Sequence, residues 1–246
     1  MVFWYTHYMN YEKVEGVSSL EHQFYKREKL ESIEGSIEIV DVKPDTPKTD
    51  VPVVMSLGWG GEPNAYKDNI ISMAERGRRT LALDTVLGVD TKDTSEDLPN
   101  AEMRKVAALL KMLEVKKLGK VDGVGYSEGA IYTSLAAFLY KEKFKNLVLI
   151  SPAGLVGERS ERQLTAGFLK DMISHLKFSL KDKRFLERFA RFYGGMAKSA
   201  LQNISNATKE VSAISGTQIQ DYLKHLKNKG IGISVIHGVD DMAFPM

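Results

Sequence analysis

The chain has 246 residues, of which 43% are hydrophobic and 27% are charged, and it contains no cysteine. This length and composition are typical of a soluble globular protein with one large domain or one domain with an insertion. The absence of cysteine excludes disulfides, thiolate nucleophiles, zinc fingers and iron–sulfur clusters, and 34 Lys plus Arg against 32 Asp plus Glu give no basis for nucleic-acid binding.

The N-terminal region is aromatic, and its first thirty or so residues show no regular hydrophobic period, so we expect an edge hairpin there. The region lacks the basic start, the long apolar run and the small-residue cleavage site of a secretory signal. No window approaches the roughly 18 uninterrupted apolar residues of a membrane span. The sequence therefore predicts a cytoplasmic protein without a transmembrane segment.

From residue 36 onward, short β-branched runs alternate with longer helical stripes. This alternation is typical of the α/β class, in which a mostly parallel β-sheet is flanked by helices. Strands are predicted at Ser36 to Val42, Val51 to Leu57, Thr80 to Leu83, Val121 to Tyr126, Asn146 to Ser151 and Ile231 to His237. Helices are predicted between them, at Tyr66 to Ala74 with a left-handed cap at Gly77, at Met103 to Leu113, and from about Ala130 to Tyr140.

The pattern changes after Pro152, because residues 156–229 contain helical stripes and no convincing strand. The stripes run from Phe168 to Leu176, from Leu186 to a stop at Gly194-Gly195, and from Ile219 to Leu226. We therefore divide the chain into an α/β core at 1–155, an inserted helical lid at 156–229 and a resumed core at 230–246. The lid carries 14 Lys plus Arg against 7 Asp plus Glu, a net charge of +7, which leaves 20 against 25, or −5, for the remainder.

The segment Gly125-Tyr126-Ser127-Glu128-Gly129 is a G-x-S-x-G motif between a predicted strand and a predicted helix. A nucleophilic serine must be lifted out of the sheet on a sharp turn, and only small residues two positions before and after it allow strand and helix to cross closely. The helix N-terminus adds positive potential where an oxyanion develops. In this context the motif predicts a nucleophile at Ser127; the alternative is a glycine-rich turn with an incidental serine.

A second glycine cluster, Gly58-Trp59-Gly60-Gly61, follows the strand predicted to end at Leu57. Small residues here would let the backbone N–H of Trp59 point into a cavity, with the N–H of Glu128 as a second donor. We predict an oxyanion hole from these two N–H groups, on a loop that Gly58 and Gly60 allow; a plain tight turn is the alternative. The side chains of Trp59 and Glu128 are expected to shape the pocket or to face solvent.

The last predicted strand runs into His237-Gly238-Val239-Asp240-Asp241. An Asp at the carboxyl end of a strand, after a glycine that lets the chain turn, lies where the orienting acid of a catalytic triad follows the serine in this chain order. The alternative is an Asx-type turn. One of the two acids is expected to cap the turn while the other acts on a histidine.

Taken in order, these segments resemble the α/β-hydrolase superfamily: Leu57 to Gly61, Leu81 to Asp84, Val106 to Leu110, Gly125 to Gly129, Leu147 to Pro152 and His237 to Asp241. The resemblance covers nearly the whole chain from about Ser36. It implies a nucleophile at Ser127 after the fifth core strand, a helical lid after the sixth, and Asp241 as the acid, with Asp240 as the second choice. The histidine usual before the first glycine of the oxyanion loop is Leu57 here, which leaves the backbone donor intact.

The resemblance also implies a histidine base on a loop roughly 20 to 40 residues beyond the acid. The histidines are His7, His22, His175, His225 and His237, and none lies at that position. We expect His237 to pack under the acid turn, and His175 and His225 belong to the lid. The simplest interpretation is a truncated sequence that lacks the last strand and the catalytic loop. Without a base, Ser127 attacks poorly, so weak or no turnover is expected.

The predicted reaction is acyl transfer from a carboxylic ester or a related small-molecule acyl substrate, with no cofactor and no metal. Thioester, amide and carbon–carbon bond hydrolysis, or acyl transfer to an alcohol, would use the same residues. From another class, the alternative is a non-catalytic binding protein with a degenerate hydrolase pocket. No nucleic-acid partner is expected.

The lid allows two interpretations of its charge and of its apolar residues. Its +7 charge could favour weak contact with anionic surfaces, or it is only a solvated face. Its apolar side chains could line an acyl pocket, or they attach the lid to the core. The residues concerned are Phe168, Met172, Phe185, Phe189 and Phe192.

Overall fold

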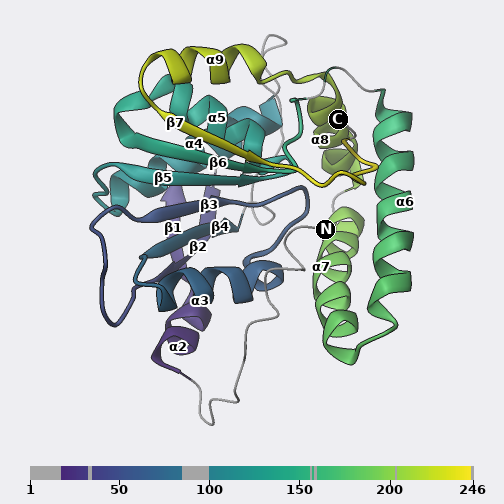
Figure 1. Cartoon of the computed structure of the whole chain (residues 1–246), viewed down its shortest axis with the longest axis horizontal. Coiled ribbons are helices and arrows are strands. Elements are labelled where there is room, and N and C mark those ends of the chain that lie inside the picture. The colour runs from purple at the N-terminus through teal and green to yellow at the C-terminus, as the bar shows by residue number, and fades with distance from the viewer. Residues whose placement is uncertain are drawn as a thin grey trace.

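The computed structural model describes residues 18–32, 35–84, 100–155, 157, 160–202 and 204–244. In this part of the chain a seven-stranded sheet carries helices on both faces (Figure 1). Its strands are β1 (Glu28–Ser32), β2 (Gly35–Val42), β3 (Val53–Ser56), β4 (Thr80–Asp84), β5 (Val121–Tyr126), β6 (Phe144–Ile150) and β7 (Gly232–Ile236). The order in the sheet is β1-β2-β4-β3-β5-β6-β7, with β3 to β7 parallel and β2 antiparallel to both of its neighbours. The predicted α/β class is confirmed.

All six predicted strands are present, and their ends differ from the prediction by at most two residues. Strands β3 and β4 are buried along their whole length, which explains their nearly continuous apolar sequences. An edge hairpin is present, but β1 and β2 form it at residues 28–42, further along the chain than the first thirty residues where it was expected. A helix that the sequence analysis missed precedes it, α2 (Ser19–Tyr25), which begins at an N-cap hydrogen bond from the Glu21 N–H to the Ser18 hydroxyl. Residues 1–17 lie outside the described part of the chain.

The helices on the sheet divide between its two faces (Figure 1). Helices α2 and α3 (Lys67–Glu75) cover one face, and α4 (Asn100–Val115), α5 (Gly129–Leu139) and α9 (Gln220–Asn228) cover the other. Short 3-10 turns at Pro63–Tyr66 and Lys141–Lys143 precede α3 and β6. The predicted left-handed cap is present at Gly77, with φ of +85°. Apolar side chains fill the space on both sides of the sheet.

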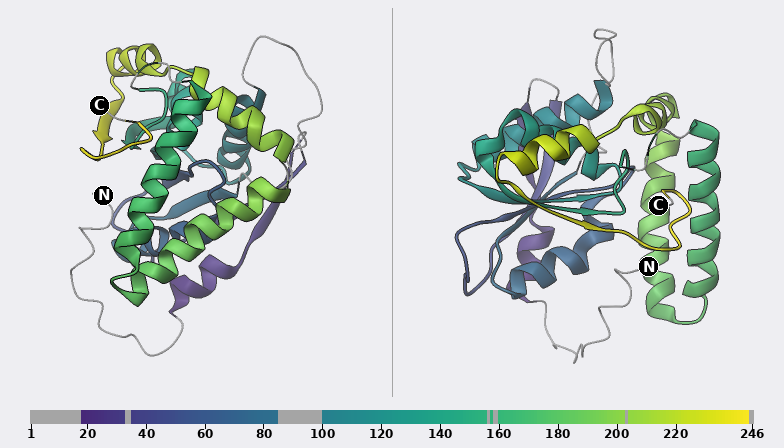
Figure 2. Two further views of the ribbon diagram at one scale, coloured as in Figure 1. Left: turned by 90° about the vertical axis from the view of Figure 1, so that its right-hand side faces the viewer. Right: turned by 45° about the horizontal axis from the view of Figure 1, so that its top comes forward.

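Helices α6 (Glu161–Ser179), α7 (Lys183–Gln202) and α8 (Ile204–Gly216) stand across one end of the sheet rather than on a face (Figure 2). The predicted helix stop at Gly194-Gly195 is wrong, because α7 continues for seven more residues and buries Met196. Within the segment 156–229, α9 behaves differently from the others. Its Tyr222 ring lies 5.0 Å from Phe138 of α5, so α9 packs on the sheet as a core helix does. Among the described helices, none combines the length and apolar character that crossing a bilayer requires.

Candidate active site

Ser127 lies on a strained turn between β5 and α5, as the G-x-S-x-G motif predicts. Its φ is +52°, a left-handed conformation that a residue other than glycine adopts at a cost and that is concentrated at functional sites. The flanking glycines have no room for a side chain. A Cβ atom at Gly125 would lie 2.6 Å from the Ala130 Cα, and one at Gly129 would lie 2.1 Å from the Ser56 carbonyl oxygen. Strand and helix can therefore cross this closely only because both positions are glycine.

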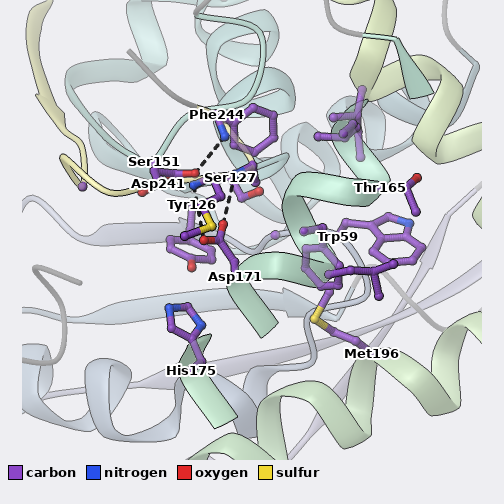
Figure 3. A pocket seen from close by; sticks show the side chains of 18 of the residues that line it. Trp59, Tyr126, Ser127, Ser151, Thr165, Asp171, His175, Met196, Asp241 and Phe244 are labelled. Atoms are coloured by element: carbon purple, nitrogen blue, oxygen red, sulfur yellow. Dashed lines mark hydrogen bonds between the residues drawn. The ribbon is translucent and has the colours of Figure 1, made fainter. Parts of the chain in front are cut away.

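Main-chain hydrogen bonds hold this turn against the next strand. The Ser127 N–H donates to the Ile150 carbonyl at 2.9 Å, and the Ser127 carbonyl accepts from the Ala153 N–H at 3.1 Å. The hydroxyl is thus presented by a turn whose backbone is fixed on both sides. It faces a cavity at the carboxyl ends of the parallel strands (Figure 3).

The Gly58 to Gly61 loop lies directly beside Ser127. A Cβ atom at Gly58 would lie 3.2 Å from the Ser127 Cβ, and the loop is closed by a Gly61 N–H bond to the Gly58 carbonyl at 2.8 Å. Gly60 has φ of +61°, which suits glycine. Between these glycines, the Trp59 N–H makes no hydrogen bond to any residue that the structure describes. The loop next to the candidate nucleophile therefore carries an N–H donor that no described residue occupies.

Glu128 provides another N–H that has no acceptor among the described residues. Its side chain differs from expectation, because it neither faces solvent nor lines the cavity: the residue is only 1% exposed. The carboxylate points away from Ser127 into the protein and accepts a 2.5 Å hydrogen bond from the Nζ of Lys105 on α4. The buried ion pair explains why a charged residue can occupy this position.

Asp241 lies at the cavity on the turn that follows β7. This turn is closed by an Asp241 N–H bond to the Gly238 carbonyl at 3.2 Å, and the Asp241 Oδ1 accepts from the Phe244 N–H at 2.8 Å. Its Oδ2 lies 3.8 Å from the Nε2 of His237, too far for a hydrogen bond. Asp241 therefore caps its own turn and keeps one oxygen near the cavity. Asp240 also lines the cavity but is exposed.

None of the described histidines makes a hydrogen bond to the Ser127 hydroxyl. The Nδ1 of His175, on α6, lies 2.7 Å from the Tyr193 hydroxyl, and burial lowers the pKa of this histidine. His175 stands apart from Ser127 in Figure 3, with Asp171 between them. The His237 side chain is 2% exposed beside Asp241, and neither ring nitrogen has a partner in the described part of the chain. His225 packs its ring against Phe138, and His7 lies outside the described residues.

Asp171 on α6 is a site residue that the sequence analysis missed. Its carboxylate accepts from the Met242 N–H at 3.2 Å and the Ala243 N–H at 3.0 Å, so it holds the turn that carries Asp241. Burial raises the pKa of Asp171. It lies three residues after Phe168, and His175 lies seven after, so all three share one face of α6. Titratable residues on an apolar helical face were the signal that could have identified this position.

The cavity has a volume of about 620 Å³, which is within the usual range of small-molecule sites. Residues at the strand ends and on α6, α7 and α8 line it. Five apolar residues of the predicted lid were candidates for the lining of this cavity, and Phe168 and Phe192 do line it. The other three, Met172, Phe185 and Phe189, do not. Its apolar and aromatic lining consists of Trp59, Tyr126, Leu164, Phe168, Leu169, Phe192, Tyr193, Met196, Val211, Ile214, Met242, Ala243 and Phe244.

The polar lining of the cavity is acidic on one side. Burial, together with the nearby carboxylates Asp241 and Asp171, raises the pKa of Tyr126 to about 12, so its phenol stays protonated. The labelled acids lie toward Ser127 in Figure 3, whereas Trp59 and Met196 lie on the other side. The cavity thus presents the Ser127 hydroxyl and the loop that carries Trp59 next to a large apolar surface.

Comparison with known proteins finds structural likeness at low sequence identity. No family model and no curated protein matches the sequence. A serine hydrolase from Cycloclasticus zankles superposes with a TM-score of 0.66 and 17% identity, over 90% of this chain and 83% of the other. An esterase from Exiguobacterium antarcticum gives 0.61 and 16%, over 89% and 83%. A bromoperoxidase from Bacillus anthracis gives 0.60 and 17%, over 89% and 83%.

Proposed function

We propose that this chain, which has the α/β-hydrolase fold, is a serine hydrolase that acts on a carboxylic ester or a related acyl substrate. One observation carries the proposal: Ser127, at φ of +52° on the turn between β5 and α5, faces a 620 Å³ cavity beside two N–H groups that have no acceptor among the described residues. A nucleophile and free backbone donors side by side are what acyl transfer requires.

In the proposed reaction, the Ser127 Oγ attacks the acyl carbonyl carbon and gives up its proton to a base. The carbonyl oxygen becomes an oxyanion that accepts hydrogen bonds from the N–H groups of Trp59 and Glu128. Collapse of this intermediate expels the alcohol, which takes the proton, and leaves an acyl ester on Ser127. A water molecule, activated by the same base, then hydrolyses this ester and restores the serine.

The base that accepts the Ser127 proton is not identified among the described histidines. We assign Asp241 to orient a histidine, as in a catalytic triad, but none of the described histidines is hydrogen-bonded to Ser127. We therefore expect the 246-residue chain to turn over slowly, with the oxyanion hole and substrate binding supplying most of its rate. The same observation favours a second candidate, a binding protein that holds an apolar acyl compound in the cavity without cleaving it.

The lid is part of the same proposal. Within the predicted segment 156–229, we assign α6, α7 and α8 to an inserted lid that closes the cavity, whereas α9 packs on the sheet. Phe168 and Phe192 would then contact the acyl group. Thioester or amide hydrolysis and acyl transfer to an alcohol would use the same residues and differ in the substrate that the cavity binds.

A fluorophosphonate probe tests the assignment, because it phosphonylates a serine only where the hydroxyl can attack and the phosphoryl oxygen is stabilised. We expect slow labelling that peptide mapping places on Ser127 and that Ser127→Ala abolishes, together with weak hydrolysis of p-nitrophenyl esters. Labelling of Ser151, which also lines the cavity, would refute the assignment of the nucleophile. If Ser127 stays unlabelled while an apolar ketone binds in the cavity, the binding protein is the correct interpretation.

A further inference from the structure

A buried lysine connects the candidate oxyanion hole to the lid. Lys105, on α4, has a side chain that is only 4% exposed. Its Nζ lies 2.5 Å from the Glu128 Oε1 and 3.1 Å from the Glu210 Oε1. Glu128 follows Ser127 in the chain, and Glu210 belongs to α8, one of the helices over the cavity. One ammonium group therefore bridges the nucleophile turn and the lid.

A second buried carboxyl group completes the cluster. Glu102, one helical turn before Lys105 on α4, is fully buried beside Glu128. Burial and the neighbouring Glu128 raise the pKa of Glu102 well above its ordinary value. Burial alone would lower the pKa of Lys105, but Glu128 and Glu210 outweigh it and keep the ammonium charged. The carboxylate of Glu128 is thus held by the ammonium group of Lys105, which Glu210 contacts as well.

Stability alone is a weak reason for such a cluster. Removing charged groups from water costs several kcal/mol per ion, and well-packed apolar residues of similar volume often stabilise a core as well or better. The cluster does, however, fix the position of the Glu128 side chain. The Glu128 side chain and its N–H share one Cα atom, so anchoring the carboxylate limits how far the N–H at the oxyanion site can rotate.

We propose that Lys105 is a positioning residue that fixes the Glu128 N–H at the oxyanion site and, through Glu210, links this alignment to the seating of α8. The inference rests on the proposed function, because it requires Glu128 to supply an oxyanion donor. A donor displaced by about 1 Å loses much of its effect on the transition state, while the binding of the ground state hardly changes. The signature is a slower chemical step at unchanged substrate affinity.

The test separates the binding constant of the fluorophosphonate from its maximal rate of phosphonylation. Lys105→Met alone leaves Glu128 buried without its cation and could fail to fold. The combined variant Lys105→Met/Glu128→Gln removes the bridge and leaves no fully buried carboxylate of the bridge unpaired, because the Glu210 side chain, which also loses its cation, is 23% exposed. We expect this double variant to phosphonylate about tenfold to a hundredfold more slowly than the wild type, at an unchanged binding constant.

Two single variants complete the experiment. Lys111→Met removes a lysine from the same helix whose side chain is 38% exposed and pairs with Glu114, and this variant should label at the wild-type rate. Glu210→Gln keeps the Lys105–Glu128 pair and should slow phosphonylation by a smaller factor, about threefold. If the double variant does not fold, the rate of Glu210→Gln tests the inference in its place. Wild-type rates in the folded double variant, or in Glu210→Gln where that variant decides, overturn the inference and leave the proposed function intact. An unlabelled wild type overturns the proposed function itself.

Discussion

Gly129 is the position where the nucleophile turn is most sensitive to added volume. A Cβ atom there would lie 2.1 Å from the carbonyl oxygen of Ser56 and 2.7 Å from that of Leu57. Both contacts are main-chain atoms at the end of β3, a buried strand with neighbours on both sides, so neither can move aside as a flexible side chain would. Gly129→Ala must therefore push the start of α5 away from β3, and Ser127 moves with it.

Two opposing contributions set the change in the free energy of unfolding that Gly129→Ala should cause. Forcing an extra methyl group into a packed interior costs about 1–3 kcal/mol, and a rigid backbone clash belongs at the upper end. Replacing glycine by alanine within a helix returns about 1 kcal/mol. A net loss of about 2 kcal/mol lowers the Tm of a chain of this size by about 4–8 °C. Displacement of Ser127 should also slow phosphonylation by about tenfold or more.

Thermal unfolding and fluorophosphonate labelling measure both effects, and α7 offers a matched control. Gly194 lies within that helix, and apart from its own helix backbone and chain neighbours no described residue has an atom within 4 Å of the position that a Cβ would take. Gly194→Ala should keep or raise the Tm and leave labelling unchanged. If Gly129→Ala matches Gly194→Ala in both measurements, the close crossing of strand and helix at Ser127 is refuted.

Three other substitutions test neighbouring parts of the account. Burial alone would raise the pKa of Asp41, but hydrogen bonds from Arg79 and Lys116 outweigh it and hold this pKa below its ordinary value. The stabilisation is therefore present above the unfolded pKa of about 4 and lost as the pH falls below it, so the Tm of Asp41→Asn should depend less on pH in that range; parallel curves would contradict this. Asp171→Asn should accelerate amide exchange at Met242 and Ala243 by about tenfold, and unchanged exchange would show that the carboxylate does not hold this turn. Tyr132→Phe deletes the 2.9 Å hydrogen bond to the Leu57 carbonyl and should cost about 1–2 kcal/mol in urea unfolding; a neutral result would argue against that bond.

The sheet was predictable from the sequence because its strands are short, apolar and separated by clear turns. Burial on both faces gives β3 and β4 continuous apolar runs, which leave little doubt about their position. Helix α2 was missed because only Leu20 and Phe24 of its seven residues are buried, too few for a visible period. The stop predicted at Gly194-Gly195 failed because tertiary packing of Met196 outweighs the low helix propensity of two glycines.

The candidate site likewise has one part that the sequence predicts and one part that it does not. Ser127 and its flanking glycines are local in sequence, so the motif alone predicts their geometry. The Lys105 cluster is not local, since its carboxyl groups come from α4, the nucleophile turn and α8. Glu102 and Lys105 do share a helical face with the buried Leu109 and Met112, which marks them as buried charges but does not identify their partners.

The central claim is that Ser127 reacts while Trp59 and Glu128 hold the oxyanion. A crystal structure of the phosphonylated chain tests it most directly. The account predicts phosphorus bonded to the Ser127 Oγ, and a phosphoryl oxygen within about 2.7–3.1 Å of the backbone nitrogens of both Trp59 and Glu128. A phosphoryl oxygen turned away from these two nitrogens, or an adduct on Ser151, would contradict it.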